Sequence, residues 1–138
     1  MSSVTMSAIE HEWSLLQNQF DSYEKFSLII KLVNITVFSA AYLFGTLNPL
    51  LIAILLMVWA QDAIWKTFQS RIEDRLLAIE HGLLNKSPLT AFQFNTEFDK
   101  NRPNTLGLIR AYAQQALRPT IAFPHAVLVL MAATTTVA

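Results

Sequence analysis

The chain has 138 residues, of which 53% are apolar and 14% charged, and its mean hydropathy is +0.36. Soluble domains carry about 25% charged residues, so this composition predicts that water is not the main solvent of the chain. Ten basic residues balance ten acidic ones and cysteine is absent, which argues against nucleic-acid binding and excludes disulfides, thiolate metal sites and cysteine nucleophiles. Residues 1–24 are acidic and lack a basic region, so we expect no cleaved signal peptide.

The N-terminal segment, residues 1–25, is predicted to be an amphipathic cytoplasmic helix. Ser7 and Glu10 have the spacing of a capping box, which favours a helix start there. Apolar residues recur here at spacings of four and three and form one stripe along the helix: Ile9, Trp13, Leu16, Phe20 and Tyr23. The stripe could form a coiled-coil seam, lie at the membrane interface, or pack within or between subunits. We expect packing, because two heptads are too few to indicate a coiled coil and the acidic polar face is not that of a helix that adsorbs to lipid.

A transmembrane helical hairpin is predicted over residues 26–65. No side chain between Lys31 and Asp62 carries a formal charge. As one helix that stretch would be roughly 45 Å long, which exceeds the hydrocarbon core of about 30 Å. Residues 45–49 contain glycine, asparagine and proline in positions that favour a turn followed by a new helix. The sequence therefore predicts two antiparallel spans.

Residues 66–118 are predicted to form a helical cytoplasmic region that begins with an amphipathic stalk helix. Neither glycine nor proline interrupts residues 50–81, so the second span should continue into water and end near Gly82. Beyond it we expect short helices and turns, with one helix opening at Ser87-Pro88 and another over 105–117. The apolar stripe of the stalk consists of Trp65, Phe68, Ile72, Leu76 and Ile79.

Residues 119–138 are predicted to form a third transmembrane helix. The segment is apolar, contains His125 as its ionisable group, and is about 20 residues long, which suits a span. Pro124 and the threonines at 134–136 also fit an interfacial or partly buried segment. Eight of the ten basic residues lie in 66–118, so the positive-inside rule predicts that this region and the N-terminus are cytoplasmic.

Motifs for catalysis or metal binding are missing from the sequence. His11, His81 and His125 lie far apart, and the sequence has neither a zinc motif nor a glycine-rich phosphate loop. We therefore expect no enzyme, no cofactor and no metal. His125 could ligate haem or relay protons, but a hydrogen-bonded structural role is the expectation. The charges at 71–75 are expected to form an ordinary solvated helix face.

Lys31 and Asp62 are candidates for an intramembrane polar pair. In an antiparallel hairpin with its turn near residue 46, these two positions lie at equal depth, and Asn34 and Gln61 are polar at similar depth. The pair could fix the register of the hairpin, which we favour, or act as a gate or proton-sensitive latch. Alternatively Lys31 reaches the headgroups and Asp62 begins the wet part of the helix.

Four short runs stand out along the second half of the chain: Met57-Val-Trp-Ala-Gln-Asp62, Arg71-x-Glu73-x-Arg75, Phe92-Gln-Phe-Asn95 and Leu117-Arg-Pro119. With these runs the chain resembles small uncharacterised bacterial inner-membrane proteins that contain a transmembrane hairpin. The general layout is also similar to that of two-span SLATT-type membrane effectors linked to antiphage defence. The resemblance implies a bacterial source and this layout, and it assigns no catalytic residue.

The sequence thus predicts an all-α integral membrane protein of the bacterial inner membrane that works without catalysis. The leading hypothesis is an oligomeric effector or pore-like protein in the lipid bilayer, whose stripes pack between copies, and the resemblance implies a role in defence. One alternative is an accessory or scaffolding subunit of a larger membrane complex. Another is a phage-type holin.

Overall fold

The protein is all-helical in a computed structural model that describes residues 3–87 and 89–138. These residues contain five helices and no strand, which confirms that the fold is all-α as predicted. The helices are α1 (Ser3–Leu43), α2 (Pro49–Leu84), α3 (Phe94–Lys100), α4 (Thr105–Ala116) and α5 (Pro119–Val137).

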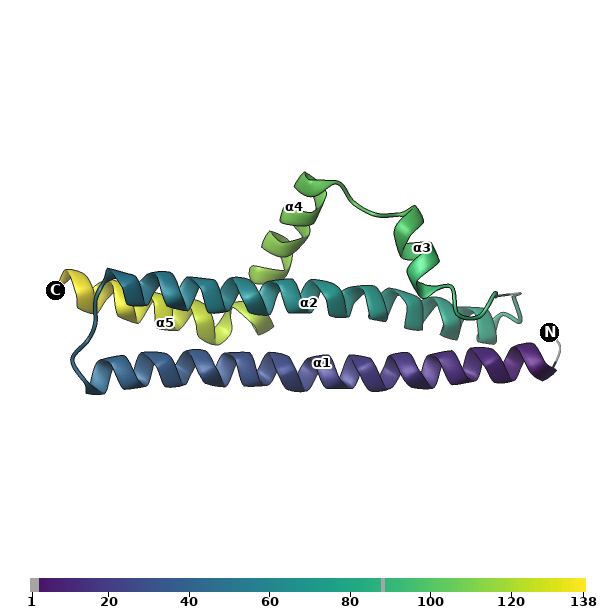
Figure 1. Cartoon of the computed structure of the whole chain (residues 1–138), viewed down its shortest axis with the longest axis horizontal. Coiled ribbons are helices and arrows are strands. Elements are labelled where there is room, and N and C mark those ends of the chain that lie inside the picture. Colours follow the sequence, from purple (N-terminus) through teal and green to yellow (C-terminus); the bar gives the residue numbers. More distant parts are fainter. Residues whose placement is uncertain (1–2, 88) are drawn as a thin grey trace.

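The two longest helices, α1 and α2, lie antiparallel along the whole length of the molecule (Figure 1). The chain turns between them at Gly45, which has a φ of 65° that glycine adopts without steric cost. Asn48 then caps α2 by accepting a hydrogen bond from the backbone N–H of Leu51 at 3.1 Å, and Pro49 occupies the first turn. Helix α1 continues without interruption across the expected boundary at residues 25 and 26.

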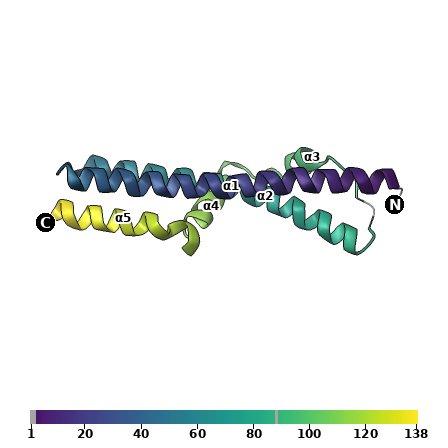
Figure 2. The ribbon, with the colours of Figure 1, turned by 90° about the horizontal axis from the view of Figure 1, so that it is seen from below.

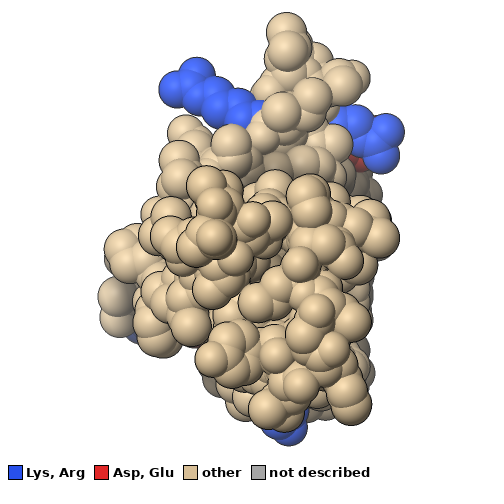
Figure 3. All heavy atoms as spheres, turned by 90° about the vertical axis from the view of Figure 1, so that its left-hand side faces the viewer, with Lys and Arg blue, Asp and Glu red and all other residues tan. Residues whose placement is uncertain are grey.

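Three helices, α1, α2 and α5, are long and apolar enough to cross a membrane. Helix α5 lies beside the first part of α2, near the turn, so that the three form a bundle at this end (Figures 1 and 2). Seen from the turn, the surface is almost entirely uncharged, and charged side chains emerge only at the edges of the view (Figure 3). Large apolar side chains cover the outside of the bundle, among them Leu28, Leu32, Leu56, Met57 and Leu130.

The opposite end of the hairpin, which we call the arm, comprises residues 3–25 of α1 and 66–84 of α2. Ile9 and Leu16 pack here against Ile72, Leu76 and Ile79 in one buried cluster. The other members of the two stripes are half-buried. Three of them pack against this cluster, namely Trp13, Phe20 and Tyr23, and the remaining two are Trp65 and Phe68. The two stripes bury each other within one chain, so their burial does not require a second copy.

Helix α2 ends at Leu84, two residues beyond the glycine that was expected to stop it. Gly82 is helical and buried, and the left-handed conformation is found instead at Lys86, with a φ of 51°. A Cβ atom on Gly82 would collide with the side chain of Leu89. The glycine therefore allows the following loop to pack closely against α2. Ser87 is not helical, and Pro88, the other half of the expected helix start, lies outside the described residues.

Helices α3 and α4, with the residues that join them, form an arch on one side of α2 (Figure 1). Asn104 caps α4 by accepting a hydrogen bond from the N–H of Gly107 at 2.8 Å. The arch returns the chain to the middle of α2, where α5 begins. Helix α5 has non-helical dihedrals at Phe123, directly before Pro124, whose ring disfavours a helical conformation in the residue that precedes it.

We expect Ile79→Ala to lower the free energy of unfolding by about 2–4 kcal/mol, because Ile79 is fully buried in the arm. Leu77, two residues earlier, is 47% exposed, so the control Leu77→Ala should change the free energy of unfolding by less than about 0.5 kcal/mol. Urea unfolding of the full chain in detergent, followed by circular dichroism, measures both. Equal effects of the two substitutions would contradict the packing of the arm.

Candidate functional site

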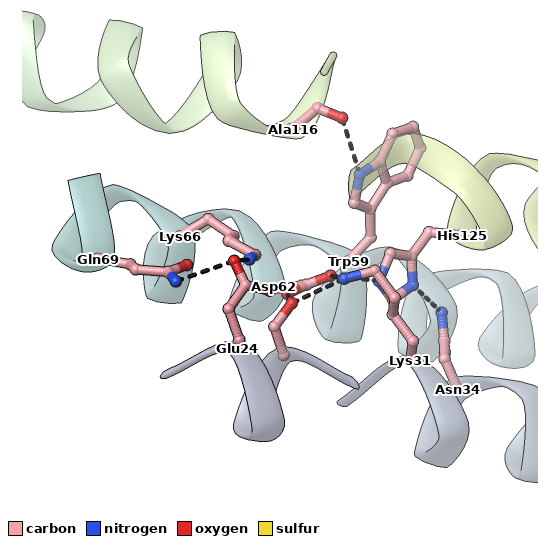
Figure 4. Close-up of polar contacts among 10 residues, drawn as sticks. Glu24, Lys31, Asn34, Trp59, Asp62, Lys66, Gln69, Ala116 and His125 are labelled. Atoms are coloured by element: carbon pink, nitrogen blue, oxygen red, sulfur yellow. Dashed lines mark hydrogen bonds and ion pairs between the residues drawn. The ribbon is translucent and has the colours of Figure 1, made fainter. Parts of the chain in front are cut away.

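Five polar side chains meet between the three candidate spans, and we call them the polar cluster. Helix α1 contributes Ser27, Lys31 and Asn34, α2 contributes Asp62, and α5 contributes His125 (Figure 4). The residues from α1 are spaced by four and three, so they share one face of the helix. Four of the five residues have no exposed surface, and the side chain of Lys31 is 16% exposed.

The carboxylate of Asp62 lies at the centre of this cluster. Its Oδ1 accepts a hydrogen bond from Ser27 Oγ at 2.6 Å, and its Oδ2 lies 2.8 Å from Lys31 Nζ. Lys31 Nζ also donates to Ser27 Oγ at 2.7 Å. On the other side, His125 Nε2 is 3.0 Å from Asp62 Oδ2. One carboxylate therefore joins α2 to both α1 and α5.

The hydrogen bonds of His125 fix its tautomer. Asn34 Nδ2, which can only donate, lies 2.7 Å from His125 Nδ1. His125 Nδ1 is therefore the acceptor, so the proton of the neutral ring is on Nε2 and is donated to Asp62. The indole of Trp59 stacks on the imidazole, with 6.3 Å between ring centroids and 13° between their planes. Asn34 Oδ1 is buried and has no hydrogen-bond partner among the described residues.

The charges within the cluster balance while His125 is neutral, because Lys31 and Asp62 carry opposite charges. Desolvating such a pair is costly, and removing one partner from a buried pair typically destabilises a protein by about 3–5 kcal/mol. Ionisable groups between membrane spans are rare and usually mark a functional site. The polar cluster is therefore the candidate functional site of this protein.

Three of the four residues that were predicted to form an intramembrane polar contact belong to the cluster. Lys31 and Asp62 are in contact, and Asn34 lies beside them but bonds His125. Gln61 is exposed, because adjacent residues of a helix point about 100° apart. Ser27 and His125 were not predicted as members. The spacing of Ser27 to Lys31 was a usable signal, whereas His125 required knowledge of how α5 packs.

A second group of polar contacts lies one helical turn further toward the arm. Lys66 Nζ forms an ion pair with Glu24 Oε1 at 2.7 Å, and Gln69 Nε2 donates to the same oxygen at 2.9 Å (Figure 4). Partial burial would raise the pKa of Glu24, but the hydrogen bonds from Lys66 and Gln69 and the charges of Lys66 and Lys31 outweigh it, so the pKa is lowered. Glu24 therefore remains ionised near neutral pH.

Arg75 departs most clearly from the expected solvated face, because it is 4% exposed. It forms ion pairs with Glu12 of α1 and Glu97 of α3, each at 2.9 Å, and it donates to Thr90 O at 3.0 Å. Burial alone would lower the pKa of Arg75, but the hydrogen bonds and charges of Glu12 and Glu97 outweigh burial and raise it. Phe92 N–H also donates to Glu12 Oε2 at 2.6 Å. These contacts attach the arch to the arm.

The other charges at 71–75 differ in their surroundings. Arg71 lies over the rings of Phe68 and Phe98, 4.7 and 4.0 Å from the ring centroids, and burial lowers its pKa. Glu73 and Asp74 are exposed, as expected of a solvated face. Across residues 3–87 and 89–138, no group of three or more His, Asp or Glu side chains is arranged to hold a metal ion.

The chain matches no known protein-family model, no curated protein and no solved structure. The site is accordingly interpreted from its own geometry.

Asp62→Asn and Lys31→Met should each destabilise the bundle by about 3–5 kcal/mol, because each leaves the other residue buried without its charged partner. The double variant should lose less than the sum of the two, by about 1–3 kcal/mol. Unfolding of the full chain in detergent measures this coupling. Gln61→Leu is the matched control and should have little effect, because its side chain is exposed. Additive single effects would show that the ion pair does not contribute.

Proposed function

We propose that this chain acts without catalysis as a small membrane effector whose conformation responds to protonation of the polar cluster. The observation that carries the proposal is the contact between Asp62 and His125, two ionisable side chains without exposed surface, 3.0 Å apart, from different candidate spans. Histidine is the side chain that most readily changes charge between pH 5 and 8. Protonation of histidines at helix interfaces is a known way to change how helices pack.

A proton added to the cluster disturbs an interhelical contact whether it binds Asp62 or His125. On Asp62 it removes the negative charge that Lys31 faces at 2.8 Å. On His125 Nδ1 it brings an N–H against the amide N–H group of Asn34, which lies at 2.7 Å. Rotation of the Asn34 amide would relieve that conflict, because Oδ1, which has no partner among the described residues, would then accept the new proton. The bound proton thus changes the contact between α1 and α5.

The arch is connected to the cluster through Trp59. Its ring stacks on His125, and its Nε1 donates to the backbone oxygen of Ala116, the last residue of α4, at 3.1 Å. Helix α5 follows α4 after two residues. A displacement of α5 would therefore reach the arch both along the chain and through this indole, which provides a route from proton binding to an output.

The membrane assignment and orientation belong to the same proposal. The apolar outer surface of the bundle supports insertion in a bilayer, and the excess of basic residues in 66–118 supports a cytoplasmic arm and arch in a bacterial inner membrane. A pore would need several copies, because the centre of one bundle is filled by side chains such as Phe38, Leu55 and Leu128.

An accessory or scaffolding subunit is the second candidate, and the surface of the arch favours it. Three large apolar side chains of this region are more than half exposed: Leu106, Ile109 and Leu117. A partner protein could cover them. The mass and composition of the detergent-extracted particle would distinguish an effector made of one repeated chain from a subunit bound to unlike chains.

Lowering the pH from 8 to 5 should change the emission of Trp59 and the hydrogen exchange of α5 in the purified full chain. His125→Gln should abolish both changes, whereas His81→Gln should retain them, because His81 is an exposed histidine outside the cluster. Asn34→Asp should move the transition to higher pH, since a carboxylate beside Nδ1 favours the protonated ring. A transition that persists in His125→Gln would contradict the proposed function.

The proposed orientation can be tested by labelling, because the chain contains no cysteine. A cysteine introduced at Ser87, in the loop after α2, should react with an impermeant maleimide only from the cytoplasmic side. A cysteine at Thr46, in the turn, should react only from the opposite side. The reverse pattern would overturn the orientation while leaving the fold intact.

A further inference from the structure

A small cavity lies about one helical turn from the polar cluster, on the side that faces the arm. Its volume is about 140 Å³, and it lies between α1, α2 and the start of α5. This is room for several water molecules, and the polar lining would bind them. The lining includes Glu24, Lys66, Glu73, Arg118, Thr120 and Ile121.

The cavity lies about one helical turn from the cluster on each helix. Lys66 follows Asp62 by four residues, which corresponds to roughly 6 Å along α2, and Glu24 precedes Ser27 by three. Ile121, which is 1% exposed, precedes His125 by one turn of α5. Figure 4 shows Glu24, Lys66 and Gln69 together on the side of Asp62 that faces away from Asn34.

The lining charges at this cavity come in both signs. Glu24 and Glu73 are acidic, and Lys66 and Arg118 are basic. Because the pKa of Glu24 is lowered, its carboxylate stays ionised at mildly acidic pH.

The other side of the cluster is apolar. From Asn34 toward the turn, the interior of the described bundle is an apolar cluster built from Phe38, Leu51, Leu55, Leu128 and Ala132. The threonines at 134–136 donate to backbone oxygens of their own helix, so they do not extend the polar cluster. A proton that reaches Asn34 therefore meets no buried ionisable group between it and the turn in the part of the chain that the structure describes.

We infer that the polar cluster exchanges protons with water only on the arm side, through this cavity, so that the protein senses the pH of one compartment and conducts no protons. The inference rests on the proposed function, because it names the source of the proton that the cluster binds. In the exchange a hydronium ion in the cavity gives one proton to the Asp62–His125 pair and leaves as water. The pair holds the proton as a unit.

The test uses the full chain with Trp13→Phe and Trp65→Phe, so that Trp59, stacked on His125, reports proton binding to the Asp62–His125 pair. The chain is reconstituted in phosphatidylcholine vesicles, and Ser87→Cys labelling identifies preparations with the arm outside or inside. A rapid drop of the external pH from 7.5 to 5.5 should quench Trp59 at once when the arm is outside. When the arm is inside, quenching should wait until a protonophore is added.

The outcomes separate the inference from the function on which it rests. Prompt quenching with the arm inside, or equal rates in both orientations, overturns one-sided access while the proton response itself stands. An absence of quenching even with the protonophore overturns the proposed function, and the inference with it. Quenching confined to the arm side supports both.

A substitution at the mouth of the cavity tests the route itself. Thr120 is exposed and lines the cavity, so Thr120→Phe should fill the space without disturbing the core. It should slow the arm-side response at least tenfold and leave the final quenching unchanged. Thr120→Val has nearly the same size as the native residue and should respond at the native rate. An unchanged rate in Thr120→Phe would show that protons take another path.

Discussion

The buried carboxylate of Asp62 is the constraint on which the bundle depends. A charged side chain that is buried from solvent must be compensated by partners within hydrogen-bond distance. Asp62 accepts hydrogen bonds from Ser27 and His125 and forms an ion pair with Lys31. These partners lie on the two other candidate spans. The need to compensate one charge therefore determines which faces of α1 and α5 turn inward and how far each helix can slide or rotate.

Two further ion pairs continue this alignment along the hairpin. Glu24 pairs with Lys66 one turn beyond the cluster, and Glu12 pairs with Arg75 in the middle of the arm. From pair to pair the residue number falls along α1 and rises along α2, as two antiparallel helices in a single register require. Buried polar contacts are best attested as devices that set register, and apolar stripes alone would tolerate a shift by one turn. The apolar clusters supply the burial, and the ion pairs select the alignment.

The bundle is asymmetric about the polar cluster. Toward the arm, polar side chains and a small cavity lead to solvent, and toward the turn the interior is filled by apolar side chains. A conductor of protons needs polar groups on both sides of its central site, whereas a sensor needs them on one. This asymmetry, together with the link from His125 through Trp59 to the end of α4, is why a sensor with a cytoplasmic output is the preferred function.

Local rules were sufficient for much of this fold. Gly45, Asn48 and Pro49 specify the turn through backbone preferences, composition identifies the long apolar helices, and helical geometry with that turn brings Lys31 level with Asp62. The tertiary structure alone decided that Arg75 is buried and that His125 completes the cluster. The contacts of Arg75 with Glu12 and of His125 with Asp62 each join residues 63 positions apart. Periodicity describes one helix at a time, so it cannot reveal which faces of separate helices meet.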